Sequence, residues 1–191
     1  MARTDNVCES PKNLPVPVDV GACDHLPRIQ LPSLPLMSTA GRIVDLATLR
    51  GRTVVYCYPR TGRPDEEPPK GWNEIPDARG CTPQSCAFRD HYEELQALGV
   101  AVFGLSTRST AVQREPSQRL HLPFELLSDV ELYFARRLRL STFEVESMTL
   151  IKRLTLIIRD RRIEKVFYPL FPPDKTAQEV VKWLSRSPLK S

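Results

Sequence analysis

Two cysteines near the middle of the chain, Cys81 and Cys86, are separated by four residues. They lie in the segment RGCTPQSCAFRDHYEEL, residues 79–95, where Gly80 precedes Cys-Thr-Pro and proline is tolerated in the first turn of a helix. A thiolate is the reactive form of cysteine, and the positive end of a helix dipole favours it. Arg79 adds local positive charge. These features predict that Cys81 begins a helix and is placed for nucleophilic or redox chemistry.

The spacing of the two cysteines limits how they can bond to one another. On an intact helix five residues rise about 7.5 Å, which puts the Cα atoms of Cys81 and Cys86 roughly 8–9 Å apart, beyond the ~7 Å limit for a disulfide. A bridge between them therefore requires the first turns of the helix to unwind. This suits a cycle with a folded form that reacts and a locally unfolded form that closes the bond.

Three interpretations of the pair compete. Both can be buried structural thiols, but the polar spacer and the Gly-Cys-Thr-Pro entry argue against this. A zinc site normally needs a second pair of ligands, and the nearest candidate is His91, on a helix beside exposed acids. We therefore expect no metal and no cofactor. The remaining interpretation is redox or nucleophilic catalysis, although the spacing is not the C-x-x-C of a disulfide reductase.

The elements that position the pair follow from the hydrophobic pattern. Residues 53–59 (TVVYCYP) and 99–106 (GVAVFGLS) are apolar runs typical of buried strands, and Cys57 in the first is expected to be a core residue. Between them, four apolar side chains at helical spacing predict one continuous helix from Cys81 onward. They are Phe88, Tyr92, Leu95 and Leu98.

Further elements are expected beyond the second strand. A short helical segment follows and is expected to be broken or restarted at Pro116. Residues 129–138 (DVELYFARRL) predict another helix, with Asp129 as its cap. Residues 152–160 and 161–169 predict two strands joined in a hairpin by a tight turn.

The last element is a predicted helix over residues 176–184, with Thr176 and Glu179 as a capping box. The whole order is strand, helix, strand, helix, helix, hairpin, helix. Such alternation favours a parallel core, to which the terminal hairpin adds antiparallel strands. We therefore expect an α/β protein with a thioredoxin-like fold, in which helices flank a central mixed β-sheet.

The N-terminal segment differs from the rest of the chain. Residues 1–25 hold several prolines and little periodicity, and they predict an extended arm before a domain that spans residues 26–191. Cys8 and Cys23 lie in this arm and are expected to be free thiols or weakly ordered residues.

A long loop precedes the cysteine helix. Residues 59–80 contain five prolines, and a loop of this length inside a compact domain is either functional or disordered. Trp72 in this loop is expected to be exposed, where it anchors the loop or forms a lip for a substrate or partner.

The composition excludes several classes of protein. Of 191 residues 41% are apolar and 26% charged, which is ordinary for a soluble globular protein. The net charge is +4 but its signs are mixed, so no nucleic-acid partner is expected. The sequence has neither the apolar core of a secretory signal nor a run of about 18 apolar residues, so no membrane partner is expected. We therefore expect a cytoplasmic protein. In the reducing cytosol a close cysteine pair is more often catalytic or metal-binding than structural.

Taken in order, several segments resemble the peroxiredoxins, and in particular their peroxiredoxin Q or bacterioferritin-comigratory branch. These segments are YCYPRTG, GCTPQSCAFRDHYEEL, GVAVFGLST, LHLPFELLSD and KRLTLIIRD, and the resemblance covers residues 26–187. It implies a thioredoxin-like fold and a thiol-dependent peroxidase that reduces hydrogen peroxide and organic hydroperoxides. It also implies recycling by thioredoxin or a similar dithiol protein, and we expect a monomer or a homodimer.

The resemblance also implies roles for individual residues. Cys81 matches the peroxidatic cysteine, whose thiolate attacks the peroxide and becomes a sulfenic acid. Cys86 matches the resolving cysteine, which condenses with that sulfenic acid to form a disulfide within the chain. Arg153 matches the active-site arginine, whose guanidinium stabilises the thiolate and orients the peroxide oxygens.

The sequence departs from the family before the reactive cysteine. The motif P-x-x-x-T-x-x-C places a threonine three residues earlier, where this chain has Ala78. Pro59 and Thr61 match the proline and threonine of the motif, but some twenty residues too early, so residues 62–78 look inserted. Either Pro59 and Thr61 fold back to the pocket, or the threonine's hydrogen bond is lost or replaced. An alternative function is therefore a non-catalytic redox sensor or binding protein on the same fold.

Overall fold

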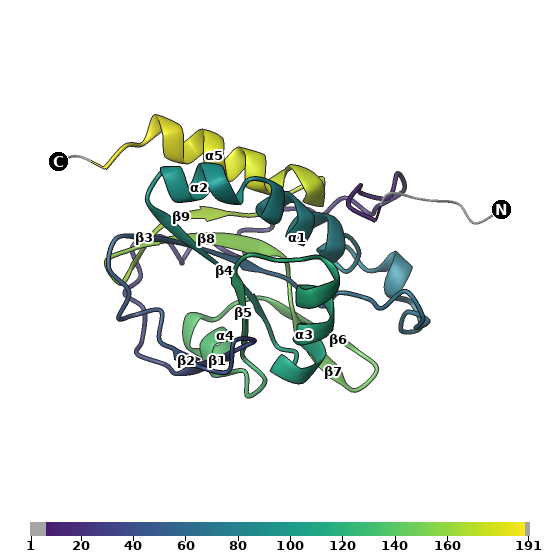
Figure 1. Cartoon of the computed structure of the whole chain (residues 1–191). Coiled ribbons are helices and arrows are strands. Elements are labelled where there is room, and N and C mark those ends of the chain that lie inside the picture. The colour runs from purple at the N-terminus through teal and green to yellow at the C-terminus, as the bar shows by residue number, and fades with distance from the viewer. Residues whose placement is uncertain (1–6, 190–191) are drawn as a thin grey trace.

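A central mixed sheet of seven strands organises the fold of residues 7–189, the part of the chain that the structure, a computed structural model, describes (Figure 1). Its strands, in the order in which they lie side by side, are β2 (Ile43–Val44), β1 (Leu36–Ser38), β5 (Glu125–Ser128), β4 (Val100–Ser106), β3 (Arg52–Cys57), β8 (Leu154–Arg159) and β9 (Arg162–Phe167). β3, β4 and β5 are parallel, and the other pairings are antiparallel. The expected mixed sheet is confirmed.

Three helices cover one face of this sheet, the upper face in Figure 1. They are α1 (Cys81–Asp90), α2 (Tyr92–Ala97) and α5 (Thr176–Arg186). Their apolar side chains, including Phe88, Leu95 and Val180, join those of the sheet in one buried cluster. The helix predicted to begin at Cys81 is present, but it is not continuous, because the backbone at His91 (φ −97°, ψ 7°) separates α1 from α2.

The opposite face is covered by α4 (Tyr133–Leu138) and by the chain that precedes β1. Leu26 and Leu31 are fully buried there and pack in the same cluster as Phe134 of α4. Cys57 also belongs to this cluster and has no exposed surface, so its expected place in the core is confirmed.

Two hairpins complete the framework. β8 and β9 are joined at Asp160 and Arg161, both of which have positive φ (45° and 71°), as a tight hairpin turn requires. This hairpin agrees with the sequence prediction. A second hairpin, β6 (Thr142–Val145) with β7 (Met148–Ile151), is not indicated by the hydrophobic pattern, and the chain runs from it directly into β8.

Two predictions about helices are wrong: the break expected at Pro116 and the start expected for the helix over residues 129–138. α3 (Thr110–Arg119) contains Pro116 and continues through it. α4 begins four residues later than expected, at Tyr133, yet Asp129 still caps it, because its carboxylate accepts the backbone N–H groups of Phe134 (2.9 Å) and Ala135 (2.8 Å). Burial of Asp129 raises the pKa of its carboxyl above the ordinary value, against the effect of these hydrogen bonds.

The capping box expected at the last helix is also absent. α5 starts at Thr176, directly after the short 3₁₀ helix η2 (Pro173–Lys175), so Thr176 is inside the helix and not before it. Its buried hydroxyl has no hydrogen-bond partner among residues 7–189. The chain therefore enters α5 from a preceding helical turn, which replaces a side-chain cap.

The N-terminal arm lies against the domain, beside α1 and the start of α5 (Figure 1). Cys8 is bonded to Cys86 of α1, and the Ser10 hydroxyl donates to the Asp174 carboxylate at 2.6 Å. The expectation that Cys8 is a free thiol is therefore wrong, whereas Cys23 is free and buried. Among residues 7–189, no helix is both long and apolar enough to cross a membrane.

Candidate active site

Cys81 is the first residue of α1 and keeps a free thiol that is 3% exposed. Gly80 before it has φ 97°, a conformation that suits glycine. A Cβ atom at Gly80 would lie 2.5 Å from the Pro173 ring, so the backbone passes closer to η2 than any other residue allows. The sulfur therefore stands at the positive end of a ten-residue helix, held there by tight backbone packing.

Arg153 lies beside this sulfur. It is fully buried in the connection between β7 and β8, and its Nη2 atom is 3.5 Å from Cys81 Sγ. The same nitrogen donates to the carbonyl oxygens of Asp77 (2.9 Å) and Arg79 (2.8 Å), and Nη1 donates to Gln84 Oε1. These acceptors fix the guanidinium plane against the sulfur.

The charge of Arg153 is only partly balanced by its neighbours. Gln84 is fully buried and neutral, so its side-chain oxygen orients the guanidinium without cancelling its charge. Asp77 is the acidic group nearby, and burial raises the pKa of its carboxyl while the Arg153 charge opposes this rise. Positive charge is thus available where a sulfur anion would form.

The second polar partner of the Cys81 sulfur is a backbone carbonyl. The thiol donates to the oxygen of Ala78 at 3.6 Å, and Ala78 stands at the position where the peroxiredoxin motif has threonine. Within residues 7–189, neither Pro59 nor Thr61 forms a hydrogen bond with the Cys81 sulfur. Pro59 is buried and its carbonyl accepts from Ser106 (2.8 Å), and Thr61 is half-buried. The structure therefore brings Cys81 and Arg153 together, but not Cys81 and Thr61.

A groove of about 820 Å³ opens in front of Cys81. One wall comes from the 59–80 loop and another from arm residues on both sides of Cys8. Trp72 of this loop is 8% exposed, which corrects the expectation that it is exposed. It packs with Leu150 and Val145 of the β6–β7 hairpin. This packing anchors the loop. The β6–β7 hairpin that provides it is not indicated by the hydrophobic pattern of the sequence.

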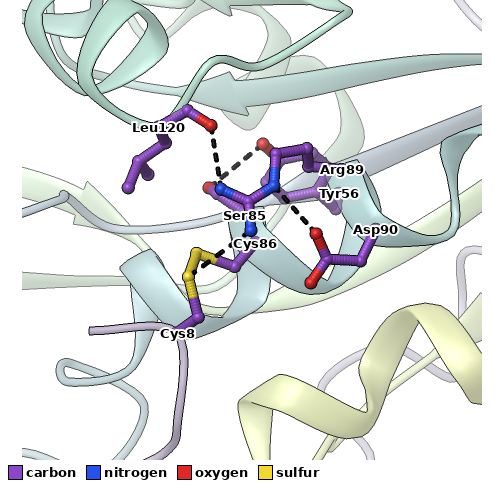
Figure 2. Close-up of a disulfide and its surroundings, with 7 residues drawn as sticks. All are labelled: Cys8, Tyr56, Ser85, Cys86, Arg89, Asp90 and Leu120. Atoms are coloured by element: carbon purple, nitrogen blue, oxygen red, sulfur yellow. Dashed lines mark hydrogen bonds and ion pairs between the residues drawn. A yellow bond between two sulfur atoms is a disulfide. The ribbon is translucent and has the colours of Figure 1, made fainter. Parts of the chain in front are cut away.

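Cys86 is held in a disulfide, but with a different partner from the one that the resemblance implies. It is 1% exposed and bonded to Cys8, with 5.5 Å between the Cα atoms (Figure 2). Arg89, one turn further along α1, donates from Nη2 to Cys8 Sγ at 3.6 Å. The structure thus pairs the cysteine of the arm with the second cysteine of the helix, and leaves Cys81 as a thiol.

The other cysteines are set apart from this site. Burial, helped by Asp19 and Asp24, raises the pKa of the Cys23 thiol to about 11. Burial also raises the pKa of Cys57 well above its ordinary value. Neither is a ready nucleophile near neutral pH. No group of three or more His, Cys, Asp or Glu side chains suited to a metal ion occurs in the described part of the chain.

Comparison with known proteins decides the family. A protein-family model described as Redoxin matches residues 22–182. The chain belongs to the redoxin family. Among curated relatives, this redoxin is 40% identical over 99 residues to the chloroplastic peroxiredoxin Q of Oryza sativa subsp. japonica, a match that covers 51% of this chain. It is 31% identical over 157 residues to peroxiredoxin Q of Populus jackii, which covers 80% of this chain and 65% of that protein. The chain spans 39% of the length of the first curated relatives that it matches.

Solved structures agree on the fold. The peroxidoxin BcpB of Mycobacterium tuberculosis superposes with a TM-score of 0.70 at 22% identity, covering 87% of this redoxin and 100% of that chain. Peroxiredoxin Q of Xanthomonas campestris gives a TM-score of 0.65 at 19% identity, covering 91% and 96%. The thioredoxin-like fold and the resemblance to peroxiredoxin Q that the sequence predicted are confirmed.

Proposed function

We propose that this redoxin is a thiol-dependent peroxidase that reduces hydrogen peroxide and organic hydroperoxides. The observation that carries the proposal is the place of Cys81 Sγ, at the first residue of α1 and 3.5 Å from the buried Arg153 guanidinium. A helix N-terminus and a fixed cation both favour a thiolate over a thiol. The names of the curated relatives support the same class of reaction.

The proposed reaction begins when the Cys81 thiolate attacks one peroxide oxygen. The O–O bond breaks, the sulfur becomes a sulfenic acid, and the other oxygen leaves as water or an alcohol after it takes up a proton. Negative charge moves from sulfur to the leaving oxygen during this step. The Arg153 guanidinium and the backbone N–H groups at the start of α1 stabilise that charge throughout. Apolar and charged walls of the groove leave room for an organic substituent on the peroxide.

Resolution in this proposal uses Cys86 as a thiol. Its sulfur displaces hydroxide from the Cys81 sulfenic acid, which gives a disulfide and water after protonation. The first turns of α1 must open for this step, because an intact helix keeps the two Cα atoms roughly 8–9 Å apart. A thioredoxin or similar dithiol then restores the thiols. A cytoplasmic location and a monomeric or homodimeric state stay predictions.

The experiment compares peroxide consumption by the wild type and by Cys81→Ser, each with a thioredoxin system. We expect the wild type to consume peroxide and Cys81→Ser to lose this activity, because serine cannot form a sulfenic acid. Cys23→Ala is the matched control, a thiol outside the groove whose loss should not change the rate. Equal consumption by the wild type and Cys81→Ser contradicts the proposal.

A second candidate function rests on the hydrogen bond from Cys81 to the Ala78 carbonyl. A carbonyl accepts from the protonated thiol and so favours it over the thiolate, whereas a threonine hydroxyl at this position could donate to the thiolate. This arrangement favours a redox sensor whose oxidised form is read by a partner. In that case Cys81 oxidises slowly, and the effect of Cys81→Ser is the loss of a partner interaction and not the loss of peroxidase activity.

A further inference from the structure

The disulfide between Cys8 and Cys86 joins residues 78 positions apart in the sequence, across the arm and α1. Its Cα atoms are 5.5 Å apart, inside the usual range for a disulfide. The bond exists while α1 is intact from Cys81 to Asp90. Cys86 therefore has two possible partners: Cys81, which requires α1 to open, and Cys8, which does not.

We propose that Cys8 is a second resolving cysteine, which takes Cys86 from a Cys81–Cys86 disulfide and releases Cys81 as a thiolate. The proposal rests on the proposed peroxidase function of Cys81. In the first step Cys86 condenses with the Cys81 sulfenic acid to form a disulfide and water. In the second, the Cys8 thiolate attacks the Cys86 sulfur, the Cys8–Cys86 bond forms, the Cys81–Cys86 bond breaks, and Cys81 takes the electron pair. The oxidation state of the chain does not change in this exchange.

The structure supplies a reason for the exchange to proceed. The Cys81–Cys86 disulfide holds the first turns of α1 open, whereas the Cys8–Cys86 disulfide is compatible with the closed helix. Closing α1 buries Pro83, Gln84 and Ser85 again and returns Gln84 Oε1 to the Arg153 guanidinium. Each of these contacts favours the second disulfide over the first.

Arg89 prepares Cys8 for the attack. Its guanidinium lies 3.6 Å from Cys8 Sγ and is held by the Leu120 carbonyl (2.9 Å) and the Asp90 carboxylate (2.8 Å), as Figure 2 shows. The thiolate is the attacking species, and a fixed cation beside this sulfur stabilises its negative charge during the attack. The hydrogen bond between Ser10 and Asp174 keeps this part of the arm on the domain.

Exposure determines where a reductant enters. Cys8 is partly exposed, whereas Cys86 is 1% exposed inside the helix. An external dithiol therefore attacks the Cys8 sulfur, and Cys86 leaves as the thiolate that the next cycle needs. Cys81 is free in this state and beside Arg153, so the chain can accept a second peroxide before it is reduced.

The test starts with fully reduced protein from which the reductant has been removed. Excess peroxide is added, the reaction is stopped by alkylation at increasing times, and disulfides are identified by mass spectrometry of peptides. In the wild type we expect Cys81–Cys86 to form first and Cys8–Cys86 to replace it. The freed Cys81 then reacts again, so the wild type consumes twice as much peroxide in the fast phase as Cys8→Ser. Cys8→Ser should stop at Cys81–Cys86.

Two variants show whether the Cys8–Cys86 bond forms through Cys81. Cys23→Ala removes another cysteine of the arm and should behave as the wild type does. In Cys81→Ser, peroxide should not produce Cys8–Cys86 on the same timescale. Formation of that bond in Cys81→Ser at the wild-type rate, or equal peroxide consumption by the wild type and Cys8→Ser, overturns the relay.

The relay and the peroxidase proposal fail in different ways. If the wild type oxidises Cys81 but remains at Cys81–Cys86, only the relay is wrong. If Cys81→Ser consumes peroxide as fast as the wild type, the peroxidase proposal is wrong and the relay falls with it. A Cys8–Cys81 disulfide with normal turnover in Cys86→Ser would show direct resolution by Cys8, which also overturns the relay.

Discussion

Replacing Arg153 with methionine tests whether its guanidinium activates Cys81. The Nη2 atom lies 3.5 Å from Cys81 Sγ, and at an effective dielectric constant of ~20 two unit charges at that distance attract by about 4.7 kcal/mol. Loss of one preorganised donor at a developing charge typically costs about 2.7–4 kcal/mol, or a factor of ~10²–10³ in rate. We therefore expect Arg153→Met to slow sulfenic acid formation by roughly two to three orders of magnitude.

The assay is stopped-flow measurement of the second-order rate constant for peroxide with pre-reduced protein, which isolates the first step from resolution. Arg153→Met also leaves the acceptors of Gln84, Asp77 and Arg79 without their donor, so each variant must first be shown to be folded. Arg52→Met is the matched control, because Arg52 is another buried arginine, paired with Glu164 at 2.7 Å.

Arg52→Met should react at the wild-type rate. The Arg52–Glu164 pair lies at the start of β3, whereas the chain enters the Cys81 site after the opposite end of that strand. Arg153→Lys keeps a charge but loses the planar fork that the carbonyls hold, and its rate should fall between those of the wild type and Arg153→Met. A folded Arg153→Met with a rate constant within about threefold of the wild type would refute the electrostatic role.

Three other predictions concern neighbouring residues. Cys86→Ser should react once with peroxide and then stop at the sulfenic acid or overoxidise, and normal turnover with a dithiol reductant would remove Cys86 from the mechanism. Gly80→Ala should lower the free energy of unfolding by about 1–3 kcal/mol, because its φ is 97° and the new Cβ would meet Pro173 at 2.5 Å. Urea titration measures the loss, and Gly41→Ala is the control, because Gly41 has φ 80° but an added Cβ would meet no atom within 4 Å. The difference between the two variants gives the steric cost of the contact with Pro173. Equal losses of unfolding free energy in both variants would contradict this steric cost. The raised pKa of Asp77 means that the folded state binds a proton more tightly than the unfolded chain, so this group's contribution to stability falls as pH rises from 3.8 through the folded pKa. Asp77→Asn should remove the part of the decline in stability between acidic and neutral pH that comes from this carboxyl. If the urea midpoint of Asp77→Asn depends on pH as that of the wild type does, Asp77 is not the group responsible.

The strands and the start of the cysteine helix could be predicted because local chemistry decides them. β3 reads RTVVYC and is buried along its whole length, and Gly80 before Cys81 is the residue that the tight helix entry requires. The turn at Asp160 and Arg161 follows from two flanking apolar strands. In each case the signal lies within a few neighbouring residues.

The remaining features depend on contacts between distant segments. Nothing near Cys8 in the sequence indicates Cys86 as its partner, because the arm has no periodicity and a disulfide follows from tertiary placement. The burial of Trp72 depends on the β6–β7 hairpin, more than 60 residues later, which has no clear signal in the hydrophobic pattern. The place of Arg153 beside Cys81 is implied by the resemblance and not by the strand pattern.

Oxidation of one particular sulfur is the central claim, and chemical trapping tests it most directly. Pre-reduced Cys86→Ser, which cannot resolve, is exposed to equimolar peroxide in the presence of a cyclic 1,3-dione that reacts with sulfenic acids. Peptide mass spectrometry should find the adduct on Cys81, with Cys23 and Cys57 unmodified. An unmodified Cys81 with the adduct on another cysteine would contradict the claim that the α1 N-terminus and Arg153 create the reactive thiol.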